Sequence, residues 1–141
     1  MTMETKNRNW KKMVIVSFVA GIGMWIVGGL WHNLILPAVD NSIHPHHQGL
    51  GIVLIAYVIL GLLMSYLYTL SFGDNKSWKN GVLIGVMVGV LWVFPHGLSM
   101  AATHGTSIIY EFKNTLYHVF EQGIGGVLVF WVFKVKSVLP V

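Results

Sequence analysis

Seven histidines are the residues of this chain best suited to chemistry, because a neutral imidazole binds copper, zinc or nickel and exchanges a proton near neutral pH. The chain has no cysteine, which excludes thiolate sites. Three of the imidazoles lie together in His44-Pro45-His46-His47. We interpret this run as a metal-ligand cluster or as a polar loop at a membrane surface, since three ligands so close in sequence seldom complete a tetrahedral site alone.

A second candidate site consists of His96, Met100 and His104, which are spaced four residues apart. They share one face if a helix continues past Pro95. The thioether of Met100 favours copper(I) over zinc. The alternative is that these side chains only pack near the end of a span, or bond to a carbonyl that Pro95 leaves free.

The third candidate site is His118, Glu121 and Gln122, which lie on one helical face at positions i, i+3 and i+4. A carboxylate within a bilayer is costly and usually serves a function. We predict that Glu121 bonds to His118 or His96, and that the pair orients a ligand imidazole or relays protons. An interhelical hydrogen bond that holds the helices together is the alternative. The order His-x-x-Glu reverses the Glu-x-x-His of di-iron bundles and argues against that site.

The composition indicates a membrane protein, with 55% hydrophobic and 10% charged residues against about 25% charged in soluble domains. Four apolar segments, about 13–36, 48–72, 80–100 and 110–134, each approach or exceed the roughly 20 residues that a span needs. We therefore predict one integral membrane domain over residues 1–141, an all-α bundle of four transmembrane helices with the lipid bilayer as its partner. The net charge of the chain is +4. Its basic residues lie beside the apolar segments and form no stripe, which argues against binding of nucleic acid.

Basic residues predict the orientation of the four spans. One side carries Lys6, Arg8, Lys11, Lys12, Lys76, Lys79, Lys134 and Lys136, and the other carries Lys113. By the positive-inside rule both termini face the cytoplasm, as in a multi-pass protein of the bacterial inner membrane. All seven histidines then lie in the outward half. Counted from the lysines, His96 and His118 reach similar depths of about 25 and 24 Å, and His32 lies slightly nearer the outer surface.

Gly81, Gly85 and Gly89 form a smooth strip on the third span, against which another helix can pack closely. We expect this contact within the chain, with a homo-oligomer or a larger membrane complex as the alternative. Two segment matches also predict a duplicated hairpin in parallel repeats: 27–31 with 88–92, and 47–51 with 121–125. The second match pairs His47 with Glu121, although about 36 Å of helix follows the first segment and only about 18 Å the second.

The sequence resembles a family group at several of these positions. Gly-Gly-Leu-Trp-His32, the Gly-x3-Gly third span ending near Pro95, and Glu121-Gln122-Gly123-x-Gly125-Gly126 are similar to small four-span bacterial membrane proteins grouped as domains of unknown function. The resemblance implies a four-helix bundle and no particular activity.

These patterns support three hypotheses about function. The leading one is an outward-facing histidine site around Glu121 for a transition metal such as copper or zinc, or for haem held by His96 and His118. The second is a structural or accessory subunit that packs through its glycine faces. The third is a small proton-conducting, ion-conducting or transport protein that uses His118 and Glu121. We recognise no arrangement of nucleophile, base and oxyanion donors, so binding or conduction is favoured over enzymatic chemistry.

Overall fold

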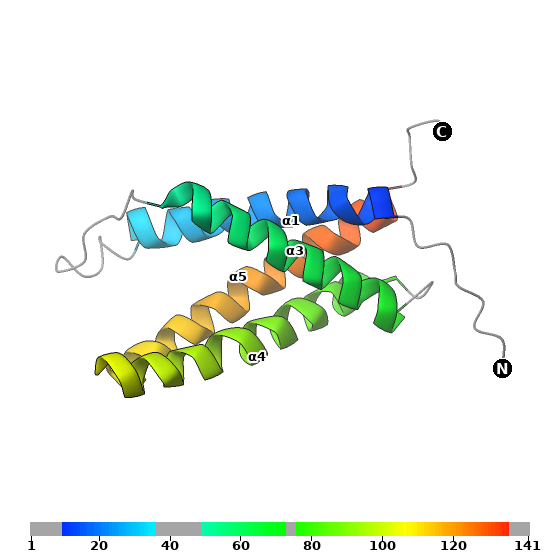
Figure 1. Ribbon diagram of the computed structural model, residues 1–141. Coiled ribbons are helices and arrows are strands. Elements are labelled where there is room, and N and C mark those ends of the chain that lie inside the picture. Colours follow the sequence, from blue (N-terminus) through cyan, green and yellow to red (C-terminus); the bar gives the residue numbers. More distant parts are fainter. Residues whose placement is uncertain (1–9, 36–48, 73–75, 136–141) are drawn as a thin grey trace.

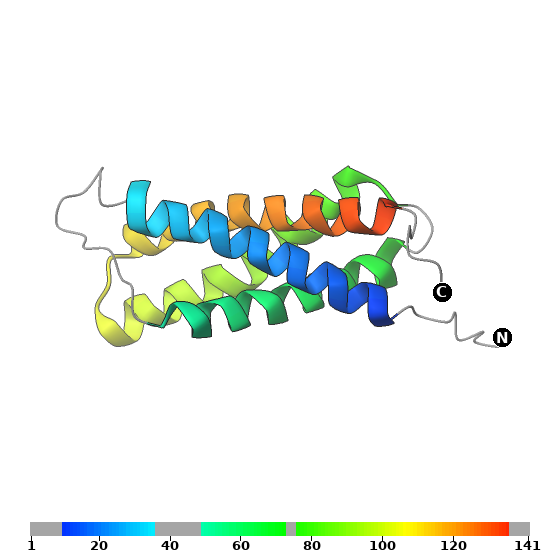
Figure 2. The ribbon, with the colours of Figure 1, turned by 90° about the horizontal axis from the view of Figure 1, so that it is seen from above.

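The computed structural model describes residues 10–35, 49–72 and 76–135. These residues form a bundle of four long helices that run back and forth, and they contain no strand (Figures 1 and 2). The elements are α1 (Trp10–Leu30), a π-helical segment (Trp31–Ile35) that continues it, α3 (Leu50–Phe72), α4 (Trp78–His104) and α5 (Ile108–Lys134). The predicted all-α four-helix bundle is confirmed, and α4 continues past Pro95 to His104.

All four helices are long and apolar enough to cross a membrane. The outer surface of the bundle is apolar as well: Ile52, Leu91 and Phe120 are 75%, 69% and 66% exposed. Such a surface would promote aggregation in water, whereas lipid tails cover it without cost. The chain is thus built as a multi-pass membrane protein.

Local sequence signals account for the ends of α4. Ser77 precedes the helix, and its side-chain oxygen accepts a hydrogen bond of 3.1 Å from the backbone N–H of Asn80. This bond satisfies one of the donors that a helix start leaves free. Gly105 follows the last turn with φ of 69°, the left-handed conformation that ends many helices and that glycine adopts without strain.

The helices pack as two hairpins, α1 with α3 and α4 with α5, and α1 also packs against α5 (Figure 1). Glycines let α4 and α5 touch backbone to backbone: a methyl group at Gly81 would collide with the carbonyl of Gly126, and one at Gly85 with the carbonyl of Gln122. At Gly89 it would lie 2.9 Å from the Cα atom of Val119. We call this contact the glycine seam; it places the strip predicted on the third span within the chain.

The structure also bears on the duplicated hairpin. Gly28 and Gly89, paired by the first segment match, both approach α5 within one turn, at Glu121 and at Val119. The second match does not relate equivalent positions. Gly49 precedes the first residue of α3, whereas its counterpart Gly123 lies well inside α5. His47 lies outside the described residues. The duplication therefore stays a prediction that rests on the first match.

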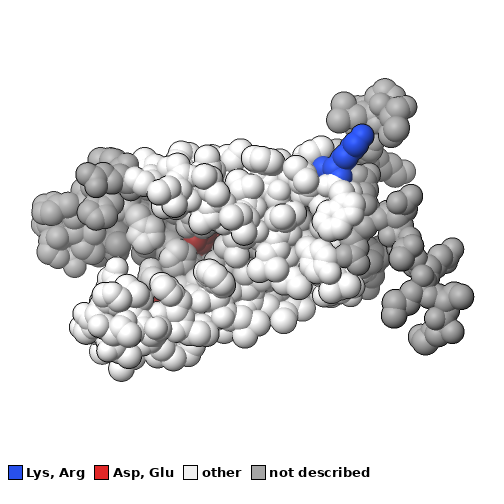
Figure 3. All heavy atoms as spheres, viewed as in Figure 1, with Lys and Arg blue, Asp and Glu red and all other residues white. Residues whose placement is uncertain are grey.

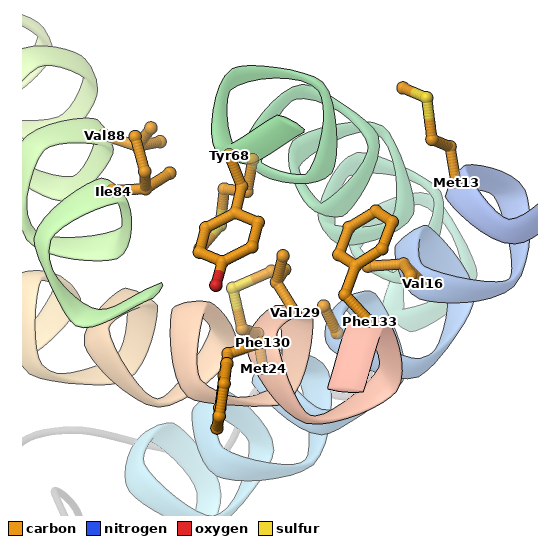
Figure 4. Packing of buried hydrophobic residues seen from close by; sticks show 11 residues of the cluster. Met13, Val16, Met24, Tyr68, Ile84, Val88, Val129, Phe130 and Phe133 are labelled. Carbon is orange, nitrogen blue, oxygen red and sulfur yellow. The ribbon is translucent and has the colours of Figure 1, made fainter. Parts of the chain in front are cut away.

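The interior of the bundle is divided along its length. The half where α1 begins and α5 ends holds an apolar cluster (Figure 4), which includes Met13, Val16, Met24, Tyr68, Ile84, Val88, Val129, Phe130 and Phe133. Ser17 and Ser65 are also buried in this half. The other half buries larger polar side chains and both carboxylates of the described residues, namely Glu111, Thr115, Glu121 and Gln122. Basic side chains gather at the apolar end, where Lys12 Nζ donates to the carbonyl of Phe133 at 3.0 Å. On the face shown in Figure 3 the basic atoms lie at this end and the acidic atoms away from it.

Replacing Gly85 with alanine is expected to lower the free energy of unfolding by about 1–3 kcal/mol, because the added methyl group overpacks the glycine seam. Unfolding of the purified protein in detergent micelles, followed by circular dichroism, measures the change. Gly29→Ala is the matched control, since nothing lies within 4 Å of a Cβ atom added there. Equal losses in the two variants would contradict the close contact of α4 with α5.

Candidate functional site

Glu121 is the centre of the candidate site, and its side chain is fully buried. Tyr57 Oη donates a hydrogen bond of 2.7 Å to Oε1 of Glu121. His118 Nδ1 is hydrogen-bonded to Oε2, also at 2.7 Å. Each carboxylate oxygen thus has a partner on a different side chain. Because a buried carboxylate without partners is very costly, these two short bonds are what make its position tolerable.

Three helices position these groups. His118 and Glu121 are three residues apart on α5, so their side chains lie on one face. Tyr57 reaches them from α3, and α1 leaves the necessary space at Gly28. A methyl group at Gly28 would lie 2.6 Å from Oε1 of Glu121 and 2.8 Å from Oη of Tyr57. The absence of a side chain there lets the tyrosine and the carboxylate meet.

His32 adds a second imidazole at the outer edge of the site. It lies in the π-helical segment that follows α1, and its ring centroid is 5.9 Å from that of His118. Wide turns of this kind are frequent at functional sites. Tyr117 supports the pair, since it stacks on Trp31 at 4.5 Å and meets the edge of His32 at 5.6 Å. Glu121 is fully buried and both imidazoles are half-buried, so Glu121, His118 and His32 form a series from the interior toward the surface.

Three buried polar atoms on the same elements have no hydrogen-bond partner within the described ranges: Asn33 Oδ1, Tyr117 Oη and Gln122 Oε1. Leaving such an atom unsatisfied costs about 1–3 kcal/mol. Asn33 follows His32 directly, and the other two flank the pair formed by His118 and Glu121. Buried polar atoms of this kind bind water or a polar ligand. The polar half is therefore suited to hydration around Glu121.

The depth expected for His96 was wrong. Gly89 of α4 lies beside Val119, and Gly97 lies beside Glu111. His96 therefore sits near the level of residue 111, about seven residues or roughly 10 Å farther outward than His118. The estimate failed because it assumed that Lys79 of α4 and Lys134 of α5 lie at the same depth, whereas the end of α5 extends beyond the depth of Lys79. The sequence suggested His118 or His96 as the partner of Glu121, and the structure places His118 beside it. The imidazole next to His118 is that of His32, not that of His96.

The predicted ligands on α4 do not join this site. His96 and His104 are exposed on α4, and Met100 is half-buried. His104 Nδ1 lies 2.8 Å from Oγ1 of the neighbouring Thr103. His44, His46 and His47 lie outside the described residues. Within residues 10–35, 49–72 and 76–135, no three histidine, cysteine, aspartate or glutamate side chains form a group that could hold a metal ion.

Sequence reasoning missed two residues of the polar half. Tyr57 gave no signal, since a tyrosine within an apolar span usually only packs. Glu111 is a second buried carboxylate, 8% exposed, which accepts a hydrogen bond of 2.8 Å from Oγ1 of Thr106 and packs against Gly97. It lies in the first turn of α5, where the helix dipole favours negative charge. The position of Glu111 just before an apolar run could have indicated a carboxylate at the start of a helix.

Comparison with known proteins adds no assignment. No protein-family model, no curated protein and no solved structure matches the chain. The roles of Glu121 and its neighbours therefore rest on the geometry of this chain.

Tyr57→Phe is expected to lower the free energy of unfolding by about 1.5–3 kcal/mol, because the donor of a hydrogen bond to a buried carboxylate is lost. Unfolding in detergent micelles measures the change. Tyr110→Phe is the control, because Tyr110 is 48% exposed near the start of α5. If both variants are as stable as the wild type, the bond from Tyr57 to Glu121 does not contribute to the fold.

Proposed function

We propose that the chain is a multi-pass protein of the bacterial inner membrane that moves protons, with Glu121 as the buried group that accepts them. One observation carries the proposal: a carboxylate of zero exposure is bonded at 2.7 Å to an imidazole whose side chain is 19% exposed. A group of this kind can exchange a proton with the outer side although it is itself shielded from water.

The orientation in this proposal follows from the lysines. Lys11, Lys12, Lys76, Lys79 and Lys134 lie at the end of the bundle where α1 and α4 begin, and Lys113 lies near the opposite end. The positive-inside rule then places both termini in the cytoplasm and the pair His32 and His118 toward the outside.

The proposed proton transfer has two steps. A proton taken up at Nε2 of a neutral His118 gives an imidazolium ion. Its Nδ1 proton passes across the 2.7 Å bond to Oε2 of Glu121 and leaves a neutral ring and a neutral carboxylic acid. Tyr57 holds Oε1 in place during this step through its own hydrogen bond. His32, with its ring beside that of His118, is placed to deliver protons from the outer surface.

Proton flux into liposomes that contain the purified protein tests the proposal. With a valinomycin potential and an internal pH dye, the wild type is expected to acidify the interior, and Glu121→Gln to fall to the rate of empty liposomes. Glu111→Gln is the matched control, because it changes the other buried carboxylate of α5 and should retain flux. Equal flux in Glu121→Gln and wild type, or no flux above empty liposomes in the wild type, would contradict the proposal.

A second candidate function is the binding of copper or zinc by His32 and His118. It is favoured because His118 Nδ1 is held by a buried carboxylate, which is how many proteins orient a ligand histidine. Nε2 of His118 would then bind the metal together with His32. These two imidazoles fit half of a four-ligand zinc site, so further ligands would have to come from beyond the described residues. Haem between His96 and His118 is not proposed, because these residues lie at different depths.

Metal analysis separates this candidate from proton transfer. If copper or zinc binds here, His32→Ala and His118→Ala should each lower the affinity of the purified protein for the metal at least about tenfold, since loss of even a hydrogen-bond partner of a ligand costs about 10–100-fold. His104→Ala changes an exposed histidine of α4 and should have no effect. Metal-free wild-type protein that also fails to take up added copper and zinc would eliminate the candidate. Failure of both flux and metal binding would leave the structural role as the remaining hypothesis.

A further inference from the structure

A groove lies at the basic end of the bundle, between the start of α4 and the end of α5. Its volume is about 640 Å³, within the range of about 300–1,000 Å³ found for ligand sites. Two tryptophans, three other apolar residues and one lysine line it: Trp78, Trp131, Val127, Phe130, Val135 and Lys134. This groove is remote from Glu121 and takes no part in the function proposed above.

The lining combines an apolar wall with one cation. Trp78 and Trp131 are 54% and 63% exposed, which is the usual state of indoles in the interfacial belt of a membrane. Lys134 is exposed, and its Nζ lies over the ring of Phe130 at 5.7 Å from the ring centroid, so a cation stands at the rim of the aromatic wall. An apolar wall with a cation at its rim suits an amphiphile with a negatively charged head.

Neighbouring lysines also make the surroundings of the groove positive. Lys79 follows Trp78 directly, and Lys76 Nζ lies 5.4 Å from the ring centroid of Phe133. Lys12 donates to the carbonyls of Phe133 and Val135, which are negative ends of α5 beside the groove. The two carboxylates of the described chain, Glu111 and Glu121, both lie in the opposite half. The positive amino end of α4 and the negative carboxyl end of α5 meet at the groove and offset one another, so the positive charge at the rim comes from the lysines.

We propose that this groove binds an anionic phospholipid of the adjacent leaflet. Its phosphate lies at Lys134, and one acyl chain lies along Trp131 and Phe130. Basic pockets between transmembrane helices bind such headgroups, and anionic lipids are enriched in the leaflet that the positive-inside rule assigns to this end. Lys134 selects the headgroup, and the aromatic residues hold the chain.

Native mass spectrometry of the purified protein with equimolar phosphatidylglycerol and phosphatidylcholine of identical acyl chains tests the proposal. The wild type is expected to prefer the anionic lipid, and Lys134→Gln to lower that preference about fivefold, the effect of about 1 kcal/mol for one lysine near a charged surface. Lys113→Gln, which removes an exposed lysine near the opposite end, should behave as the wild type. Trp131→Ala should lower the binding of both lipids, because it removes part of the apolar wall.

Two further results decide the outcome. Glycerol phosphate has the headgroup chemistry without the chains, so it should not compete with the lipid; full competition by it would mean a simple anion site and overturn the proposal. Equal binding of the two lipids by the wild type, or an unchanged preference in Lys134→Gln, would overturn it as well. Circular dichroism of each variant checks that the bundle is intact, and Lys134→Gln alters an exposed side chain, so its result stands even if Trp131→Ala fails to fold.

Discussion

The placement of a carboxylate among apolar helices is the constraint on which the polar half of this protein depends. Glu121 has no exposure, so the chain itself must supply hydrogen-bond partners for its carboxyl group. Tyr57 and His118 provide this through two bonds of 2.7 Å, and they come from α3 and α5. Gly28 of α1 completes the arrangement by leaving room. Three of the four helices are thus tied to one another through one side chain.

The two halves of the bundle are held together in different ways. In the half with the lysines, methionine, valine, tyrosine and phenylalanine side chains pack as an apolar cluster (Figure 4). Packing of this kind stabilises the bundle by burying apolar surface. In the polar half, hydrogen bonds and stacked rings contribute instead, as with Trp31 on Tyr117 at 4.5 Å. Different interactions therefore hold the two ends of the bundle.

Much of the fold could be predicted from the sequence, because the length of each apolar run sets the length of a span. The helices begin and end within a few residues of the expected positions, and Ser77 and Gly105 account for the ends of α4. Glu121 and His118 could also be found, since a carboxylate is conspicuous in an apolar run. The sequence alone could not identify Tyr57 or the depth of His96, because both depend on how one helix is shifted along another. Glycine contacts set that shift, and the positions of lysines do not reveal it.

The glycine seam has a consequence for motion. Between α4 and α5 the backbones touch at Gly81, Gly85 and Gly89, with no side chain between them. Backbones in such close contact leave little room for relative movement, so we expect α4 and α5 to move as one unit. A rearrangement of the bundle would then be expected where α1 and α3 pack against this unit. The hydrogen bond from Tyr57 to Glu121 joins α3 to α5 across that boundary, so one side chain connects the two hairpins.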